Sequence, residues 1–233
     1  MATSNVETTI PSWKGLYQFA AVAALIMVGI IIIQLIIFMA APPPLEGSAI
    51  DWFTLFRTNK LIGLIDFELL MIIYMLISVA ITLSLYYALR RTDPAFTALY
   101  AALSLIGVVC FIAARPVFEM LSLSDQFAAA ATETQRSSLL AAGESTLAAF
   151  HGTAFHVSYV LGSLSGLIIS LVMLRSPMFS KATAYVRIAS SLLDFGLYIP
   201  TIGVFISIFS VLFLFIWNIM IARRLFQLAR SKG

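Results

Sequence analysis

Long apolar runs separated by short polar segments dominate the chain. The first run, LYQFAAVAALIMVGIIIIQLIIFMA, covers residues 16–40, which is enough for a helix to cross a hydrocarbon core that needs about 20 residues. Further runs of this kind predict spans near residues 16–40, 62–89, 96–114, 150–174, 184–200 and 202–222. The pattern therefore predicts an all-α polytopic transmembrane helix bundle of about six spans.

The polar segments between the spans carry helix stop and start signals. APPP at 41–44 cannot continue a helix. Ser48 and Asp51 have the spacing of a capping box, with Asp in place of the usual Glu or Gln. The stretch DWFTLF that begins at Asp51 fits a short helix lying in the membrane interface. We therefore expect short interfacial helices in the outer loops.

The longest polar segment is residues 122–149, which is rich in Ser, Thr, Ala and Gln. It is too polar to cross a bilayer, and its alanines favour helix. We expect an amphipathic surface helix that breaks at Gly143, leads into the span at 150–174 and covers the outer side as a lid.

Composition indicates that the solvent of this bundle is lipid. Hydrophobic residues make up 61% and charged residues 11% of the chain, against about 45–50% and about 25% in soluble domains. We expect one bundle over residues 15–228 between a polar tail at 1–14 and a basic tail at 229–233. The net charge of +3 does not indicate nucleic acid, because the basic residues lie beside the spans. A single cysteine, Cys110, excludes an intramolecular disulfide and a cysteine metal cluster.

The basic residues also predict an orientation. Six spans place both termini on one side, where ten Lys and Arg residues lie against four on the other. Lys181 and Arg187 are counted on the richer side. By the positive-inside rule both termini are cytoplasmic, in the plasma (inner) membrane. The first run exceeds the h-region of a signal peptide, so we expect it to be a retained span.

Ionisable side chains gather toward the outer half of the predicted bundle. Charged groups are costly in lipid and usually face the interior or a water-filled cavity, so we expect a polar outer pocket. Its candidate ligand or proton sites are Asp66, His151, Asp194, His156 and Tyr198. The alternative is that headgroups and water solvate them, because most lie within two turns of a boundary.

Helical spacing places the two acidic residues of LIGLIDFELL on different sides of the helix. Asp66 and Glu68 are two positions apart, which is about 200° around a helix, so they cannot point into one pocket. We expect Asp66 to be buried and paired with a polar group, and Glu68 to be interfacial. Arg115 and Glu119 are spaced i,i+4 and predict a structural ion pair.

The fourth span carries a stripe of small residues. Ser158, Gly162, Gly166 and Ser170 recur at intervals of four, the pattern of close helix packing in membranes. His151 lies seven residues before Ser158 and so stands above the same face. We expect Asp66 to be its partner, while His156 points nearly the other way.

The sequence offers little catalytic chemistry. The two histidines are five residues apart and about 140° apart on a helix, unlike the i,i+4 pair of a helical zinc site. A mixed site of one histidine with Asp66 or Asp194 stays open. No GxSxG elbow, Walker loop or GxGxxG motif occurs. We therefore predict no metal and no cofactor, and we lean against an enzyme.

Two stretches carry a resemblance. LVMLRSPMFSKATAYVRIASSLLDFGLYIPTIGVF and FIWNIMIARRLFQL resemble a family of uncharacterised bacterial multi-pass membrane proteins filed as a domain of unknown function. The likeness consists of an Asp early in the second span, an LxRS-type loop before the fifth and a W…ARRLF-like exit. The resemblance implies a bacterial inner-membrane protein of about six spans, with no known active site.

Three functions fit these observations. The first is a non-enzymatic binding, sensory or accessory subunit whose outer pocket takes a lipid or small ligand, with membrane lipids and other membrane subunits as partners and no nucleic acid. The second is a proton- or ion-coupled transporter that uses Asp66 or Asp194. The third is an intramembrane hydrolase that uses His151 and a carboxylate.

Overall fold

The described part of the chain is helical throughout. The structure, a computed structural model, describes residues 13–231, so residues 1–12 of the predicted tail at 1–14 and residues 232–233 of the predicted tail at 229–233 lie outside the described residues. Within this part no strand occurs, which confirms the all-α prediction. The elements in order are α1 (Lys14–Ala40), α2 (Ala49–Thr58), α3 (Lys60–Asp66), α4 (Leu69–Leu89), α5 (Pro94–Ala113), α6 (Val117–Ala129), α7 (Glu133–Phe150), α8 (Thr153–Arg175), α9 (Lys181–Asp194), the 3-10 turn η1 (Phe195–Tyr198) and α10 (Gly203–Arg230).

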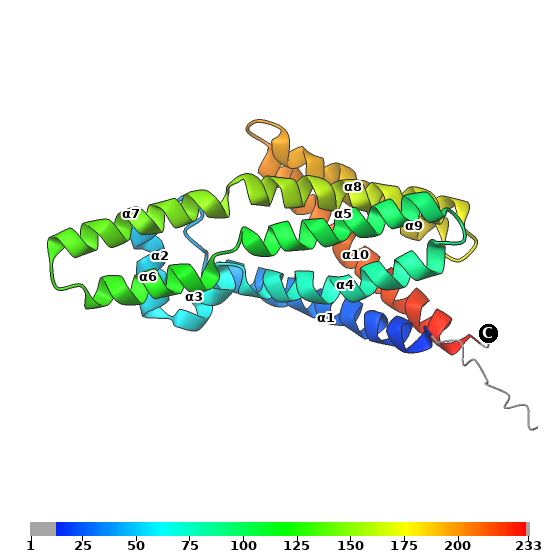
Figure 1. Ribbon diagram of the computed structural model, residues 1–233, viewed down its shortest axis with the longest axis horizontal. Helices are drawn as coiled ribbons and strands as arrows, with labels where there is room; N and C mark the ends of the chain where they lie inside the picture. Colours follow the sequence, from blue (N-terminus) through cyan, green and yellow to red (C-terminus); the bar gives the residue numbers. More distant parts are fainter. Residues whose placement is uncertain (1–12, 232–233) are drawn as a thin grey trace, which may run out of the picture.

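The bundle consists of α1, α4, α5, α8, α9 and α10 (Figure 1). Five helical stretches of the described chain are long and apolar enough to cross a membrane: Lys14–Ala40, Leu69–Leu89, Pro94–Ala129, Glu133–Arg175 and Phe205–Arg230. The predicted span at 184–200 corresponds to α9 and η1. With 14 residues, α9 is about 21 Å long and shorter than a hydrocarbon core of about 30 Å. It packs between α8 and α10.

The bundle keeps its small residues inside and its large apolar residues outside. Ala20, Ala21 and Ala24 are fully buried on α1, where this helix packs along α10 and α4. Large side chains such as Phe19 and Phe205 are exposed on the outer surface. A soluble protein rarely exposes so much contiguous apolar surface, which agrees with a lipid solvent.

A second, smaller unit, which we call the outer unit, consists of α2, α3, α6 and α7 and lies at one end of the bundle. There α6 and α7 continue from α5 and α8 as a helical hairpin, and α2 and α3 pack across it (Figure 1). We call its apolar core the outer cluster, made of Ala49, Trp52, Phe53, Phe56, Phe67, Val117, Met120 and Phe150. The predicted interfacial helix is α2, whose aromatic side chains are buried in this cluster. Ser48 N–H donates to Asp51 Oδ2 at 2.8 Å, which confirms the capping box.

Gly143 has a different role from the one expected. It lies inside α7, which runs unbroken from Glu133 to Phe150, so the segment 122–149 forms a hairpin in place of a broken surface helix. A Cβ at Gly143 would lie 2.7 Å from Ala49 Cβ and 2.8 Å from Phe53 Cζ. The glycine therefore lets α7 approach α2 closely.

The predicted second span at 62–89 is two helices. α3 ends at Asp66 and α4 begins at Leu69, because Glu68 adopts the left-handed conformation with φ 68°. A non-glycine residue with positive φ is uncommon and interrupts helical hydrogen bonding. The break separates the acidic start of this segment from the apolar span that follows.

Candidate functional site

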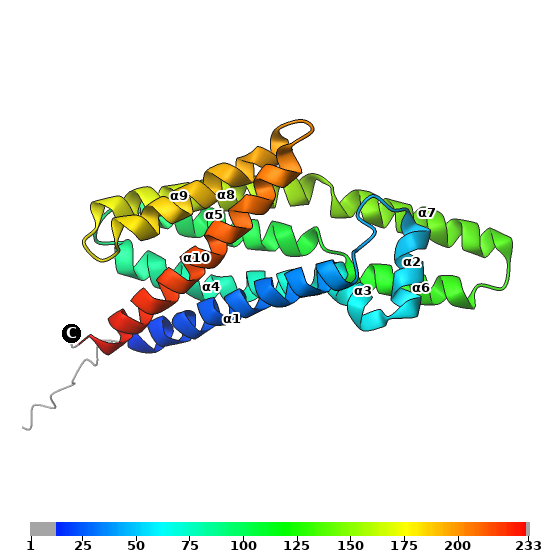
Figure 2. The ribbon, with the colours of Figure 1, turned by 180° about the vertical axis from the view of Figure 1, so that it is seen from behind.

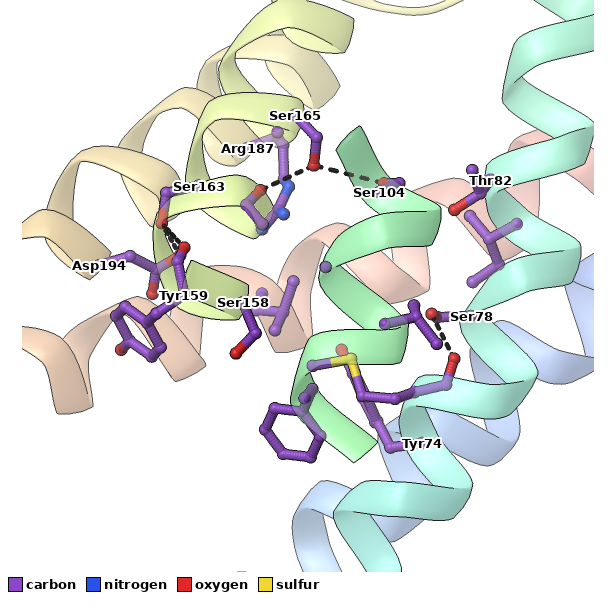
Figure 3. A pocket seen from close by; sticks show the side chains of 18 of the residues that line it. Tyr74, Ser78, Thr82, Ser104, Ser158, Tyr159, Ser163, Ser165, Arg187 and Asp194 are labelled. Carbon is purple, nitrogen blue, oxygen red and sulfur yellow. Dashed lines mark hydrogen bonds between the residues drawn. The ribbon is translucent and has the colours of Figure 1, made fainter. Parts of the chain in front are cut away.

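The main cavity lies among the bundle helices, and not in the outer unit. Its volume is about 260 Å³, and side chains from α1, α4, α5, α8, α9 and α10 line it. Polar groups face it from several helices: Tyr74, Ser104, Tyr159, Ser163, Arg187 and Asp194 (Figure 3). A cavity with a few convergent polar groups in a mostly apolar wall is the usual form of a small-molecule site.

Arg187 brings a positive charge to the cavity wall. Its guanidinium lies over the Trp217 ring, with Cζ 5.2 Å from the ring centroid, and Nη1 donates to Ser190 Oγ at 3.4 Å. Space for it comes from Gly166 on α8, where a Cβ would lie 2.8 Å from Arg187 Cζ. Among the described side chains no carboxylate forms an ion pair with Arg187.

Asp194 brings a negative charge to the same wall. It lies seven residues after Arg187 on α9, so the two share a helix face and are about 10 Å apart along the axis. Ser163 Oγ donates to Asp194 Oδ2 at 3.5 Å. One turn before Ser163 on α8, the Tyr159 hydroxyl forms a hydrogen bond with Ser207 Oγ. Hydroxyl groups therefore contact this carboxylate, and Arg187 acts on it electrostatically from farther along the wall without forming an ion pair.

Further polar contacts join the helices around the cavity. Ser104 Oγ donates to Ser165 Oγ at 3.3 Å and connects α5 to α8. Asn218 Nδ2 donates to Tyr74 Oη at 3.2 Å and connects α10 to α4. Within the part of the chain that is described, no group of three His, Cys, Asp or Glu could hold a metal ion. The arrangement is suited to binding a polar ligand.

The small-residue stripe borders this cavity. Ser158, Gly162 and Gly166 line it, and Ser170 is buried with its hydroxyl donating to Gly166 O at 2.7 Å. Opposite, α5 approaches through Gly107, where a Cβ would lie 3.6 Å from Ser158 O. The stripe thus faces both a close helix contact and the cavity.

The predicted histidine sites lie apart from the cavity. His151 is exposed at the junction of α7 and α8, and its ring contacts Phe150. His156 is exposed, and its Nδ1 lies 3.4 Å from Tyr198 Oη. The expected pair of His151 with Asp66 does not form, because neither carboxylate oxygen of Asp66 has a hydrogen-bond partner among the described residues.

Arg115 forms its ion pair with Glu68, not with Glu119. Arg115 Nε lies 2.5 Å from Glu68 Oε2, while Glu119 is exposed on α6. The physical reason is a helix interruption: α5 ends at Ala113 and α6 begins at Val117, so positions 115 and 119 do not share one continuous helix. The i,i+4 rule applies only within such a helix.

Sequence reasoning missed Arg187, Tyr159 and Ser163 as site residues. Arg187 was counted with the cytoplasmic charges because it follows Lys181 closely in the sequence. A signal was available in the spacing of seven between Arg187 and Asp194, which places two opposite charges on one face of a short helix.

These features define a polytopic helical membrane protein with an internal cavity whose mostly apolar wall carries a few polar groups. The chain belongs to the family described as Domain of unknown function (DUF4386), whose model matches residues 22–226. This confirms the resemblance to an uncharacterised family. No curated protein and no solved structure matches the chain.

Proposed function

We propose that this protein is a non-enzymatic membrane protein that binds a small anionic or zwitterionic ligand in the central cavity. The observation that carries the proposal is Arg187, a cavity-lining arginine with no carboxylate in ion-pair contact among the described side chains. Charged groups in membrane bundles mark ligand or ion pathways. Asp194 lies in the same wall but does not reach ion-pair contact, and the proposed ligand places a negative group directly on the guanidinium.

The chemistry of the cavity narrows the ligand class. A guanidinium donates to carboxylate or phosphate oxygens in a bidentate way, and Asp194 accepts from an amine or hydroxyl about 10 Å along the helix. The volume of about 260 Å³ lies just below the range of about 300–1,000 Å³ typical of drug-sized ligands. A small carboxylate or phosphate with an amino or hydroxyl group at its far end meets these conditions.

We also propose the membrane in which the protein lies and the side on which its termini lie. The start of α1 and the end of α10 lie at the same end of the bundle (Figure 2). Basic residues, among them Arg90, Arg91, Arg223 and Arg224, follow the spans toward that end, which supports cytoplasmic termini in a bacterial inner membrane. Membrane lipids surround the bundle, and the outer unit stands on the opposite side.

Ligand screening with two arginine variants tests the proposal. The purified protein in lipid nanodiscs is titrated with a panel of small carboxylates, phosphates and amino acids, with thermal stabilisation and calorimetry as readouts. Arg187→Gln is compared with Arg223→Gln, which removes an exposed arginine on α10. We expect an anion that binds wild type and Arg223→Gln, and binds Arg187→Gln about 10- to 100-fold more weakly. Binding that survives Arg187→Gln unchanged, or no binding across the panel, contradicts the proposal.

A further inference from the structure

Asp66 is a buried carboxylate without a partner. The residue is 1% exposed, and neither Oδ1 nor Oδ2 has a hydrogen-bond partner among the described residues. A buried polar group is normally hydrogen-bonded, and a buried charge is normally paired or bound to a metal ion. This carboxyl group therefore either holds a proton or binds a positively charged species.

The helix break beside Asp66 adds free backbone acceptors. Glu68 N–H donates to Ile65 O in place of Leu64 O, and Met71 N–H donates to Glu68 O in place of Phe67 O. As a result the carbonyl oxygens of Leu64 and Phe67 receive no backbone N–H among the described residues. Carbonyls freed at broken membrane helices are the ligands that coordinate Na⁺ or protons in transporters.

Gln34 on α1 supplies a further oxygen at the same place. Its side chain is 7% exposed, and Nε2 donates to Ile65 O at 3.1 Å, which holds the amide against the break. The other side-chain atom, Oε1, is buried and has no partner among the described residues. The helix break at Asp66 therefore holds several oxygen acceptors without a donor among the described residues.

Nearby charged residues do not neutralise Asp66. Arg115, which reaches the same helix break, pairs with Glu68. Lys60, at the start of α3, pairs with Asp125 on α6. The local ligand supply is thus one carboxylate with neutral oxygens, which fits a singly charged ion better than a divalent one, since Ca²⁺ sites usually combine several carboxylates.

We propose that Asp66, together with Gln34 Oε1 and the freed carbonyls at the α3–α4 break, binds a monovalent cation of the size of Na⁺. A proton would satisfy one oxygen and leave the other acceptors unmatched, whereas a cation coordinates several oxygens together. This site is separate from the central cavity and does not depend on the ligand proposed there.

Sodium titration of the full-length protein tests this site. The protein is purified in choline buffer, and NaCl, KCl or choline chloride is added at constant ionic strength, with calorimetric heat and thermal stability as readouts. We expect saturable binding of Na⁺ near one ion per chain and a rise in melting temperature that choline does not produce. Asp66→Asn should abolish both effects, and Gln34→Leu should weaken Na⁺ binding about tenfold.

Two control variants separate loss of the Na⁺ site from a general effect of removing a charge. Asp125→Asn removes an exposed carboxylate of the same outer unit and should bind Na⁺ like wild type, as should Arg187→Gln. A response equal for Na⁺ and choline overturns the proposal, and so does Na⁺ binding that persists in Asp66→Asn. An infrared band of a protonated carboxyl that is present at every Na⁺ concentration and absent in Asp66→Asn also overturns it, because a proton then holds the site. Gln34→Leu tests the site should Asp66→Asn not fold.

Discussion

Arg115 and Glu68 form an ion pair, with Nε 2.5 Å from Oε2, that connects the α5–α6 junction to the α3–α4 break. The Arg115 side chain is 3% exposed, and its Nη1 donates to Phe150 O at 3.1 Å, at the end of α7. Its guanidinium also lies over the Phe150 ring, with Cζ 4.2 Å from the centroid. One side chain thus joins three connections between the bundle and the outer unit.

Replacing Arg115 by methionine should strongly destabilise the protein. Arg115→Met leaves Glu68 partly buried without its counter-ion, and breaking a buried pair in this way costs about 3–5 kcal/mol. The measurement is the free energy of unfolding in detergent micelles.

Glu119→Gln is the control for that change, because Glu119 is exposed and takes no part in the pair. Its effect should stay within about 0.5 kcal/mol. Equal losses in both variants would mean that the contact of Arg115 with Glu68 does not contribute the stability assigned to it.

Gly143→Ala should loosen the packing of α2 on α7. The added Cβ would lie 2.7 Å from Ala49 Cβ, and such overpacking costs about 1–3 kcal/mol. Hydrogen exchange should be faster at the α2 amides. Gly29→Ala on α1, where a Cβ meets nothing within 4 Å, should leave exchange in α2 as it is; faster exchange in both variants would refute a local clash.

Two glycines of the stripe should respond differently to the same substitution. A Cβ at Gly166 would overlap the Ser191 hydroxyl and lie 2.8 Å from Arg187 Cζ, whereas a Cβ at Gly162 meets nothing within 4 Å. Gly166→Ala should cost about 1–3 kcal/mol of unfolding free energy, and Gly162→Ala close to none. If thermal unfolding shows equal costs, the stripe acts through uniform helix packing and not through space reserved for Arg187.

The start of α2 should be sensitive to acid. Hydrogen bonds from the Ser48 backbone N–H and hydroxyl lower the pKa of Asp51 below its ordinary value of 3.8. A carboxyl with a lowered folded pKa contributes stability above its unfolded pKa, and that contribution is lost as pH falls through the folded value. Protection of the α2 amides should therefore fall as the pH drops below the ordinary value of 3.8 toward the lower folded pKa.

In Asp51→Asn this acid-dependent part of the α2 protection should be missing. Hydrogen exchange followed across the same pH range in both proteins measures it. An identical pH response in the variant would assign the effect to other carboxylates.

Hydrophobic periodicity was enough to predict the helical class and most of the spans. The helix ends at Ala40, Leu89 and Arg175 lie close to those expected, because prolines and charges at these places stop helices in any context. The capping box at Ser48 was likewise visible, since it depends on residues three apart.

The partners of the charged residues could not be predicted in the same way. The pair of Arg115 with Glu68 spans 47 residues and depends on the left-handed conformation of Glu68, which no local pattern announced. Arg187 was assigned to the cytoplasmic side by its position in the chain, although the fold turns it toward the cavity. Spacing rules hold within one helix, whereas these contacts depend on how separate helices dock.

The hairpin of α6 and α7 forms an arm that extends past the end of the bundle, beyond the short breaks that separate α5 from α6 and α7 from α8. The 18 residues of α7 extend about 27 Å, so the turn between α6 and α7 lies at the end of the molecule opposite the start of α1 and the end of α10 (Figure 1). Ala131 and Thr132 in this turn are exposed, so an epitope inserted there can be tested with an antibody on intact and on permeabilised cells. The arm thus offers a direct reading of which face of the cell the protein presents.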